Sequence, residues 1–273
     1  MNNLVLRTVT GAIYVVAVIG SIFLGSTVFL LLFFFINALV LREFLLILEK
    51  GLKIPLNSTH GIICGSILYL LISLSAMQLI DRQFLLLAAA LPAILLIIAL
   101  FGKTTQPLVK IAIILLAVAY ISIPFSLLNL LFANQSIISD GFPWILTGLF
   151  IVIWVNDSFS YLTGTFIGKH KLFERISPKK TWEGTMGGFV FSIVSGIIFF
   201  YFIGLLELWQ WIVMSGLIAL FGDFGDLTES MIKRSFNIKD SGSALPGHGG
   251  LLDRFDSLLF ATPIVVIFLT FIQ

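Results

Sequence analysis

Charged residues are scarce in this chain. Of its 273 residues, 11% are charged and 59% are hydrophobic, whereas soluble domains carry about 25% charged residues. Cysteine is almost missing as well, because Cys64 has no second cysteine to pair with. A disulfide within the chain is therefore excluded, and a cysteine-ligated metal site is not expected. This composition argues against an ordinary soluble domain and is typical of a protein that crosses a membrane several times.

Long uncharged runs divide the chain into segments of about 20 residues, the length that crosses the hydrocarbon core of a bilayer. Arg42 and Glu43 make the second segment the least regular, while Pro92 and Pro124 fall inside the fourth and fifth, where a helix bundle tolerates a kink. The first run is interpreted as uncleaved helices rather than a signal peptide. We predict an all-α polytopic integral membrane protein with about nine transmembrane helices: 9–24, 27–48, 59–79, 84–102, 109–133, 144–163, 184–204, 209–229 and 257–272.

The placement of lysine and arginine predicts how these spans are oriented, because such residues accumulate in cytoplasmic loops. With the N-terminus in the cytoplasm, the cytoplasmic ends collect fifteen of the sixteen cations, and only Arg82 lies outside. The opposite orientation would export almost all of them. We therefore expect a cytoplasmic N-terminus, with Gln273 on the outer face.

Charged residues are also unevenly divided between the two halves of the chain. Nineteen of the thirty lie between Asp157 and Asp256. We predict that residues 1–140 form a scaffold of transmembrane helices. Residues 141–273 are expected to form the catalytic part, with transmembrane helices and two cytoplasmic loops.

Carboxylates on three of the predicted spans reach a similar depth near the cytoplasmic edge, and they include Asp157, Asp226 and Asp256. Two pairs, Asp253 with Asp256 and Asp226 with Glu229, are spaced i, i+3 and so share a helix face. A carboxylate at the centre of a membrane helix costs about 2.5–3.5 kcal/mol, and less toward the edge. Such groups should therefore be paired or bound to a cation.

Carboxylates from two helices that face a common cavity would form an oxygen-rich site for a hard divalent cation such as Mg²⁺. The alternative is that these acids only form ion pairs with Lys233, Arg234 and Arg254. Asp223 can cap a helix or pair with a cation, and its role stays open.

Two loops in the C-terminal half suit phosphate. The segment L-P-G-H-G-G-L-L-D contains His248 and Gly249 just before the last span, and its glycines permit close approach of backbone amides to a ligand. A tight turn into a helix is the alternative. The other loop, 168–188, carries five cations that include Lys179 and Lys180. Topology alone also places cations in such a loop.

The residues from Ser230 to Asp256, S-M-I-K-R-S-F-N-I-K-D-S-G-S-A-L-P-G-H-G-G-L-L-D-R-F-D, resemble the signature of the CDP-diacylglycerol synthases, also called phosphatidate cytidylyltransferases. The resemblance extends to N-D-S-F-S-Y-L-T-G and S-P-K-K-T-W-E-G upstream. It implies an integral membrane enzyme of phospholipid biosynthesis, located in the inner membrane of a bacterium. Such enzymes convert CTP and phosphatidate to CDP-diacylglycerol and pyrophosphate with Mg²⁺, act as homodimers and need no nucleic acid. The placement of cations described above predicts a multi-pass protein whose active site faces the cytoplasm.

The resemblance also implies roles for individual residues. Asp226, Asp253 and Asp256 would be catalytic metal ligands, with room for a second cation, and Lys233 would act with them on phosphate. Asp223 is not part of the signature. The residues implied in substrate binding are Ser177, Lys179, Lys180, Thr181, Arg234, Lys239, His248 and Gly249.

Two other functions fit parts of the same pattern. A CTP-dependent polyprenol or lipid kinase would transfer the γ-phosphoryl group and release CDP instead of pyrophosphate. A cation-coupled transporter would also place carboxylates inside the membrane. A transporter needs access from both faces, whereas the acids of this chain cluster toward one side.

Overall fold

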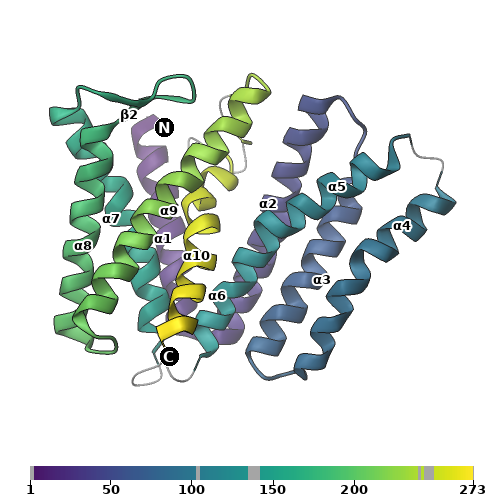
Figure 1. The fold of residues 1–273 in the computed structure, drawn as a ribbon, viewed down its shortest axis with the longest axis horizontal. Helices are drawn as coiled ribbons and strands as arrows, with labels where there is room; N and C mark the ends of the chain where they lie inside the picture. The colour runs from purple at the N-terminus through teal and green to yellow at the C-terminus, as the bar shows by residue number, and fades with distance from the viewer. Residues whose placement is uncertain (1–2, 103–104, 135–141, 239–240, 243–248, 273) are drawn as a thin grey trace. The chain divides into compact units, whose positions relative to one another are not determined.

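The computed structural model describes residues 3–102, 105–134, 142–238, 241–242 and 249–272. Helices make up most of this part of the chain (Figure 1), with one short hairpin of β1 (Lys171–Phe173) and β2 (Ser177–Thr181). The helices are α1 (Asn3–Leu24), α2 (Ser26–Leu52), α3 (Ser58–Ala76), η1 (Arg82–Ala90), α4 (Leu91–Phe101), α5 (Pro107–Ala117), η2 (Val118–Ser122), α6 (Ile123–Ala133), α7 (Trp144–Ile167), α8 (Trp182–Ile203), α9 (Leu208–Ser235) and α10 (Leu252–Ile272).

The predicted spans fall on these helices. Eight helical segments among the described residues are long and apolar enough to cross a membrane. The apolar part of α1, Thr10–Leu24, is shorter than these eight. The prediction of an all-α polytopic membrane protein is therefore confirmed.

The fourth and fifth spans are interrupted near the two prolines that the sequence singled out. In the fourth, the 3₁₀ helix η1 gives way to α4 at Leu91, and Pro92 occupies its first turn. In the fifth, the π-helical segment η2 separates α5 from α6, where Pro124 is the second residue. Proline has no N–H to donate to the preceding turn and its ring crowds that turn, so the ladder of hydrogen bonds changes there.

The chain forms two compact units. Unit 1 consists of Met1–Ala133 and Asp240–Asp253, and unit 2 consists of Asn134–Lys239 and Arg254–Gln273. The first boundary lies close to the one placed after residue 140. A segment from the glycine-rich loop nevertheless belongs to unit 1, although its sequence lies in the half predicted to be catalytic. The division of roles between scaffold and catalytic part stays a prediction.

Unit 1 is held together by a buried polar contact as well as by apolar packing of α2, α3 and α6. The Tyr69 hydroxyl donates to the Leu30 carbonyl at 2.9 Å. Asn129 Nδ2 donates to Tyr69 Oη at 2.8 Å and to Ser73 Oγ at 3.1 Å. Because unpaired polar groups in an apolar interior are costly, these bonds fix how α3 packs against α2 and α6.

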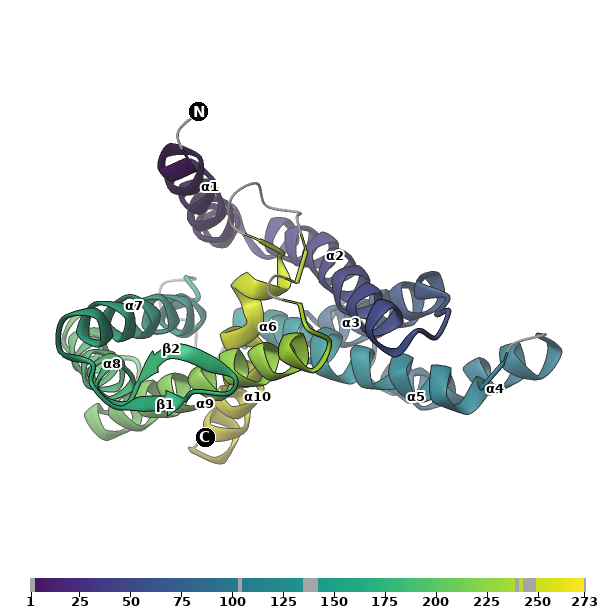
Figure 2. The same cartoon turned by 90° about the horizontal axis from the view of Figure 1, so that it is seen from above.

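In unit 2, glycines let α8 approach its neighbours closely. A Cβ atom at Gly184 would lie 2.7 Å from the Ser160 carbonyl oxygen of α7, and one at Gly196 would lie 2.7 Å from the Trp211 carbonyl oxygen of α9. Without a hydrophobic driving force between helices in lipid, such close backbone packing is a main source of their association. Figure 2 shows α7, α8 and α9 side by side, with the hairpin over one end of them.

The hairpin was not predicted, because the sequence indicated only a basic loop between two spans. Its strands are antiparallel, and Lys171 pairs with Thr181. The Trp182 amide, at the start of α8, donates to the His170 carbonyl at 2.9 Å. Strands of three and five residues are too short to show a clear alternation of polar and apolar positions.

Candidate active site

Unit 2 contains a cavity of about 480 Å³ beneath the hairpin. Helices α7, α8 and α9 form its walls, and β2 contributes two lysines. The lining residues are Asp157, Ser160, Tyr161, Gly164, Thr165, Lys171, Lys179, Lys180, Thr181, Gly184, Thr185, Asp223 and Asp226. Cations and carboxylates therefore face the same space.

Lys180 lies between two carboxylates of α9. Its Nζ is 3.0 Å from Asp223 Oδ1 and 2.7 Å from Asp226 Oδ2. Burial alone lowers the pKa of the Lys180 ammonium, but Asp226 and Asp223 outweigh it and raise that pKa above its ordinary value. Lys180 therefore stays charged at neutral pH and serves as a cation rather than as a base.

The first turn of α8 fixes the position of the hairpin. Thr181 is the N-cap, and its Oγ1 accepts the Gly184 amide at 3.2 Å. Glu183 accepts the Lys169 amide at 3.0 Å and the His170 amide at 3.2 Å, and its Oε1 is 2.6 Å from His170 Nδ1. These bonds hold both ends of the segment that carries Lys180.

Three carboxylates in unit 2 come close enough to share a cation. Asp226 and Glu229 on α9 and Asp256 on α10 each offer an oxygen, and these atoms lie within 4.8 Å of one another. Metal–oxygen distances of about 2.0–2.6 Å place ligand oxygens up to about 5 Å apart, so the group fits a hard divalent cation. The glycine at 225 allows this approach, because a Cβ atom there would collide with the Asp256 carbonyl oxygen.

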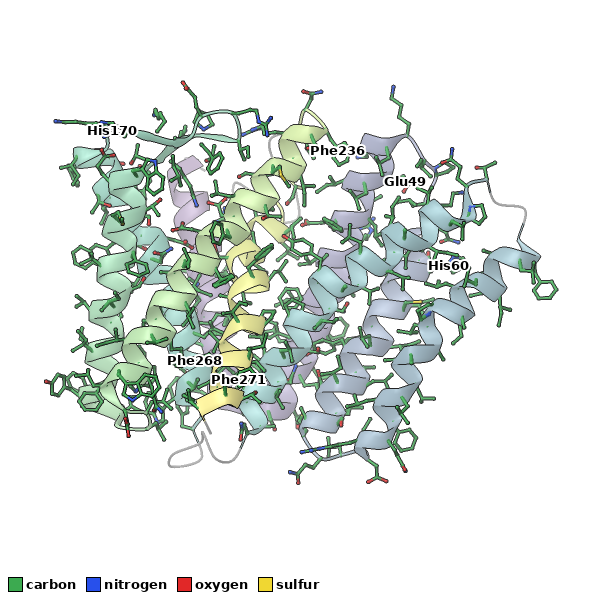
Figure 3. All side chains as sticks on the ribbon, in the orientation of Figure 1. Glu49, His60, His170, Phe236, Phe268 and Phe271 are labelled. Carbon is green, nitrogen blue, oxygen red and sulfur yellow. The ribbon has the colours of Figure 1, made fainter. Side chains whose placement is uncertain are left out.

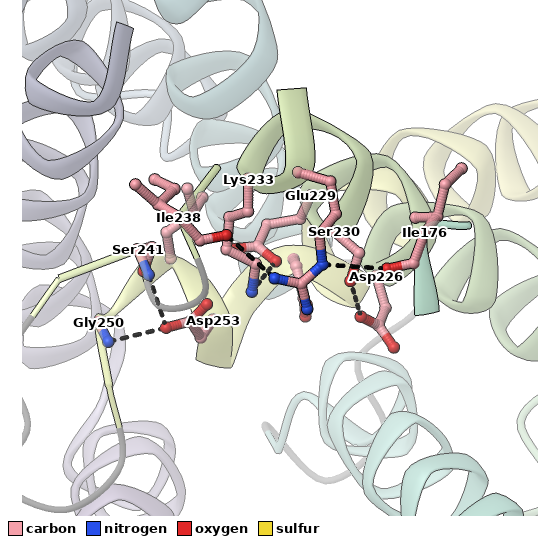
Figure 4. Close-up of polar contacts among 12 residues, drawn as sticks. Ile176, Asp226, Glu229, Ser230, Lys233, Ile238, Ser241, Gly250 and Asp253 are labelled. Atoms are coloured by element: carbon pink, nitrogen blue, oxygen red, sulfur yellow. Dashed lines mark hydrogen bonds and ion pairs between the residues drawn. The ribbon is translucent and has the colours of Figure 1, made fainter. Parts of the chain in front are cut away.

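These carboxylates also have partners within the protein. Lys233 Nζ is 2.5 Å from Glu229 Oε2, one turn along α9, and Glu229 is only 1% exposed. The Ser230 hydroxyl donates to Asp226 Oδ1 at 3.3 Å (Figure 4), and the Ser257 amide donates to Asp256 Oδ1 at 2.7 Å. Ion pairing, the alternative to metal binding, therefore holds for Glu229 with Lys233, and Lys180 pairs with Asp226.

Asp253 belongs to unit 1, where it binds backbone amides of the glycine-rich segment. Its Oδ2 accepts the Ser241 amide at 3.2 Å and the Gly250 amide at 2.8 Å (Figure 4). Gly249 has a φ of 83°, a conformation that favours glycine and that suits a tight turn into α10, so a role for this glycine in ligand binding stays a prediction. Asp253 is described in one unit and Asp226 with Asp256 in the other, and the predicted set of three ligands stays a prediction.

The chain matches the model of the cytidylyltransferase family over residues 5–272. It belongs to the cytidylyltransferase family. A phosphatidate cytidylyltransferase of Staphylococcus haemolyticus is 35% identical over 265 residues, which cover 96% of this chain and 98% of that protein. The phosphatidate cytidylyltransferases of Staphylococcus saprophyticus and Staphylococcus aureus are 34% identical over 266 residues and 39% identical over 181 residues, covering 96% and 66% of this chain. The resemblance noted from the sequence is thereby confirmed, and the kinase and transporter alternatives are not favoured.

The remaining residues predicted for this cytidylyltransferase site are distributed as follows. Lys179 lines the cavity beside Lys180 and Thr181, whereas Ser177 begins β2 and is not among the lining residues. Arg234 donates instead to the carbonyls of Ile176 at 3.4 Å and Ile238 at 3.1 Å. The other two predicted binding residues, Lys239 and His248, lie outside the described residues.

Several residues of the cavity and of the acidic group were not predicted as site residues. Glu229 had a signal, namely its i, i+3 spacing from Asp226, but its burial next to Lys233 could not be known from the sequence. Asp157 and Ser160 lie in N-D-S-F-S-Y-L-T-G, a motif that carried the family resemblance without any assigned role. In this member of the cytidylyltransferase family, α7 therefore forms one wall of the candidate site.

Proposed function

We propose that this chain transfers the cytidylyl group of CTP to phosphatidate, giving CDP-diacylglycerol and pyrophosphate in phospholipid biosynthesis. The observation that carries this proposal is the cavity of unit 2, in which Lys180 lies between Asp223 and Asp226 and a second lysine lines the same wall. Phosphates need cations at such a site, and the names of the curated relatives supply the substrate class.

The proposed reaction needs little proton transfer. A phosphate oxygen of phosphatidate forms a bond to the α-phosphorus of CTP, while the bond from that phosphorus to the oxygen leading to the β-phosphate breaks. The electron pair leaves with pyrophosphate. Because the second pKa of a phosphate monoester is about 6, the attacking group is already largely ionised at neutral pH. Charge repulsion between the two substrates is the main obstacle.

The chain's own cations lower that repulsion. The Lys179 and Lys180 side chains line the cavity, and ammonium groups fixed there would stabilise the charge that develops on the leaving pyrophosphate. Lys233 is proposed to act on phosphate as well, after exchanging its contact with Glu229. Asp223 holds Lys180 in place through its 3.0 Å ion pair.

The acidic group and the family are consistent with a divalent cation. We propose Mg²⁺, held by Asp226 and Asp256 with Asp253 as the resemblance implies, and Glu229 as the neighbour that the structure adds. A bound Mg²⁺ would neutralise phosphate oxygens and orient them for in-line displacement. A second cation is proposed on the resemblance alone.

The remaining parts of the proposal concern the cell. The relatives are bacterial, and we propose the cytoplasmic (inner) membrane, with the active site facing the cytoplasm as the distribution of cations predicts. CTP would arrive from the cytoplasm and phosphatidate sideways from the bilayer. A homodimer is proposed only because the family resemblance implies it.

Purified protein incubated with phosphatidate and each nucleoside triphosphate tests this function. We expect pyrophosphate and CDP-diacylglycerol with CTP, and none after a chelator removes divalent cations. Formation of CDP and a phosphorylated lipid would contradict the proposal in favour of a kinase.

The variant Asp226→Asn tests the role of the acidic group. We expect activity to fall by about 100-fold or more, because asparagine lacks the negative charge that pairs with Lys180 and that would bind the cation. Binding of Mn²⁺, followed by electron paramagnetic resonance, should weaken in parallel. Asp81→Asn, which changes an exposed aspartate that accepts a hydrogen bond from Gln83 Nε2 at 3.4 Å, is the matched control and should leave both readouts unchanged.

A further inference from the structure

Glu43 is a charged residue inside a predicted membrane span, and the structure gives it a partner far along the chain. Its Oε2 on α2 accepts the Leu252 amide at 3.0 Å, across 209 residues of sequence. Its Oε1 is buried and has no hydrogen-bond partner within the described part of the chain. Both residues belong to unit 1. The carboxylate of Glu43 therefore reaches the start of α10.

Two glycines leave the space that this carboxylate occupies. A Cβ atom at Gly242 would lie 2.7 Å from Glu43 Oε1, and one at Gly250 would lie 2.7 Å from Glu43 Oε2. Gly250 also donates its amide to Asp253 Oδ2 at 2.8 Å. The glycine-rich segment is thus packed around the Glu43 side chain, and any larger residue would displace it.

This arrangement has a physical reason. The first amides of a helix lack partners within the helix, and a carboxylate both accepts their hydrogen bonds and interacts favourably with the helix dipole. Leu252 is the first residue of α10, and Asp253 accepts the Gly250 and Ser241 amides on the same turn. Burying a carboxylate is costly, so an apolar side chain would fill the space at lower cost if packing were its only purpose.

We propose that Glu43 is a positioning residue for the reaction: its carboxylate fixes the turn from Gly249 to Leu252, and with it the backbone of Asp253. Glu43 itself does not touch substrate or the reacting atoms. The inference rests on the proposed cytidylyl transfer, because an ordered turn affects the reaction only if this segment binds phosphate through Gly249 and a cation through Asp253.

The first test compares Glu43→Ala with Glu43→Gln. Glutamine keeps an oxygen that can accept the Leu252 amide, so kcat should stay within about threefold of the wild type, whereas alanine should lower kcat by about tenfold or more. The KM for CTP and the thermal midpoint in detergent should change little, which separates positioning from loss of fold. Full kcat in Glu43→Ala, or an equal loss in both variants, would overturn the proposal.

Glu49 supplies the matched control. It is a carboxylate on the same helix, α2, and Figure 3 shows it near the end of that helix. Glu49→Ala removes the same group without touching the turn before α10, so its kcat should equal that of the wild type. A loss equal to that of Glu43→Ala would mean that any acid on α2 suffices, and would overturn the proposal.

A second variant tests the same contact from the other side. Alanine at 242 pushes the Glu43 carboxylate away, and the backbone of Gly242 is not among those with positive φ. Gly242→Ala should therefore lower kcat like Glu43→Ala, and the double variant should be no worse than either one. Losses that multiply in the double variant would show that the two residues act separately and would overturn the proposal.

Hydrogen exchange distinguishes failure of this inference from failure of the proposed function. If the wild type forms no CDP-diacylglycerol, the function is wrong, whatever Glu43 does. In either case, a peptide containing the Leu252 amide should exchange faster in Glu43→Ala than in the wild type and in Glu49→Ala. Unchanged exchange would overturn the positioning role even in an active enzyme.

Discussion

Among the lysines that line the cavity, Lys180 is the one for which the described part of the chain shows two ion pairs. Two carboxylates hold its ammonium, and the raised pKa keeps it charged. Such a buried cation stabilises a site only while its partners remain ionised. The same three charges therefore depend on one another, and we propose that Lys180 contributes its positive charge to phosphate binding in the cavity.

Replacing Lys180 by methionine should remove this cation while keeping most of its volume. Asp223 and Asp226 would then face each other without a counterion, and kcat/KM for CTP should fall by about 100-fold or more. A steady-state assay over CTP concentration measures the change. Lys169→Gln, on an exposed lysine that is not among the lining residues, should retain wild-type kinetics; comparable losses would show that only the net charge of the loop matters.

The sequence predicted the kinds of residues at the site better than their partners. Asp226 and Asp256 were expected to come together, and the structure brings them within reach of one cation. Glu43 stood out in the sequence only as a charged residue that interrupts the apolar second span. Its hydrogen bond to the Leu252 amide could not be predicted, because a contact across 209 residues leaves no local sequence pattern. Lys180, which pairs with Asp226, lies in a basic loop whose cations could be explained either by ligand binding or by membrane topology alone. The sequence could not decide between the two, since residue spacing does not show where a loop folds back.

At the scale of helices and strands, hydropathy was sufficient for the spans but not for the connections. A continuous apolar run of about 20 residues has few alternatives in a membrane, so α2, α7 and α10 were expected near their observed positions. The β1–β2 hairpin depends on capping and backbone contacts by Thr181 and Glu183, which no hydropathy pattern reports.

The close packing of α8 against α9 gives a prediction for stability. Gly196→Ala should lower the free energy of unfolding by about 1–3 kcal/mol, because the new methyl group meets the Trp211 carbonyl oxygen. Thermal unfolding in detergent measures it. Gly20→Ala is the control: apart from the backbone of its own helix, no atom of the described residues lies within 4 Å of the added Cβ, so its thermal midpoint should not fall. Equal midpoints for the two variants would contradict tight packing at Gly196.

For the whole molecule, the distribution of charge predicts an orientation across the membrane. Within unit 2, Figure 3 shows His170 and Phe236 at one end and Phe268 and Phe271 toward the other. The hairpin end carries the lysines of the cavity, so the cation rule predicts that this end faces the cytoplasm.

Cysteine labelling tests this orientation, because Cys64 is the only native cysteine and can be replaced by serine. In intact cells, a maleimide that cannot cross membranes should label Asp81→Cys, at the end of the third span. It should label Glu174→Cys, in the hairpin, only after the cells are opened. The reverse pattern would contradict a cytoplasmic active site.

The bond from Glu43 to Leu252 bears on how such an enzyme can be divided. A fragment that starts after residue 134 would contain the whole recognised signature, yet the helix that ends it would begin with an uncapped amide. Supplying α2 on a separate polypeptide would restore the missing acceptor. The recognisable half of this gene product is therefore expected to be inert alone and to recover only by complementation with the half that looks featureless.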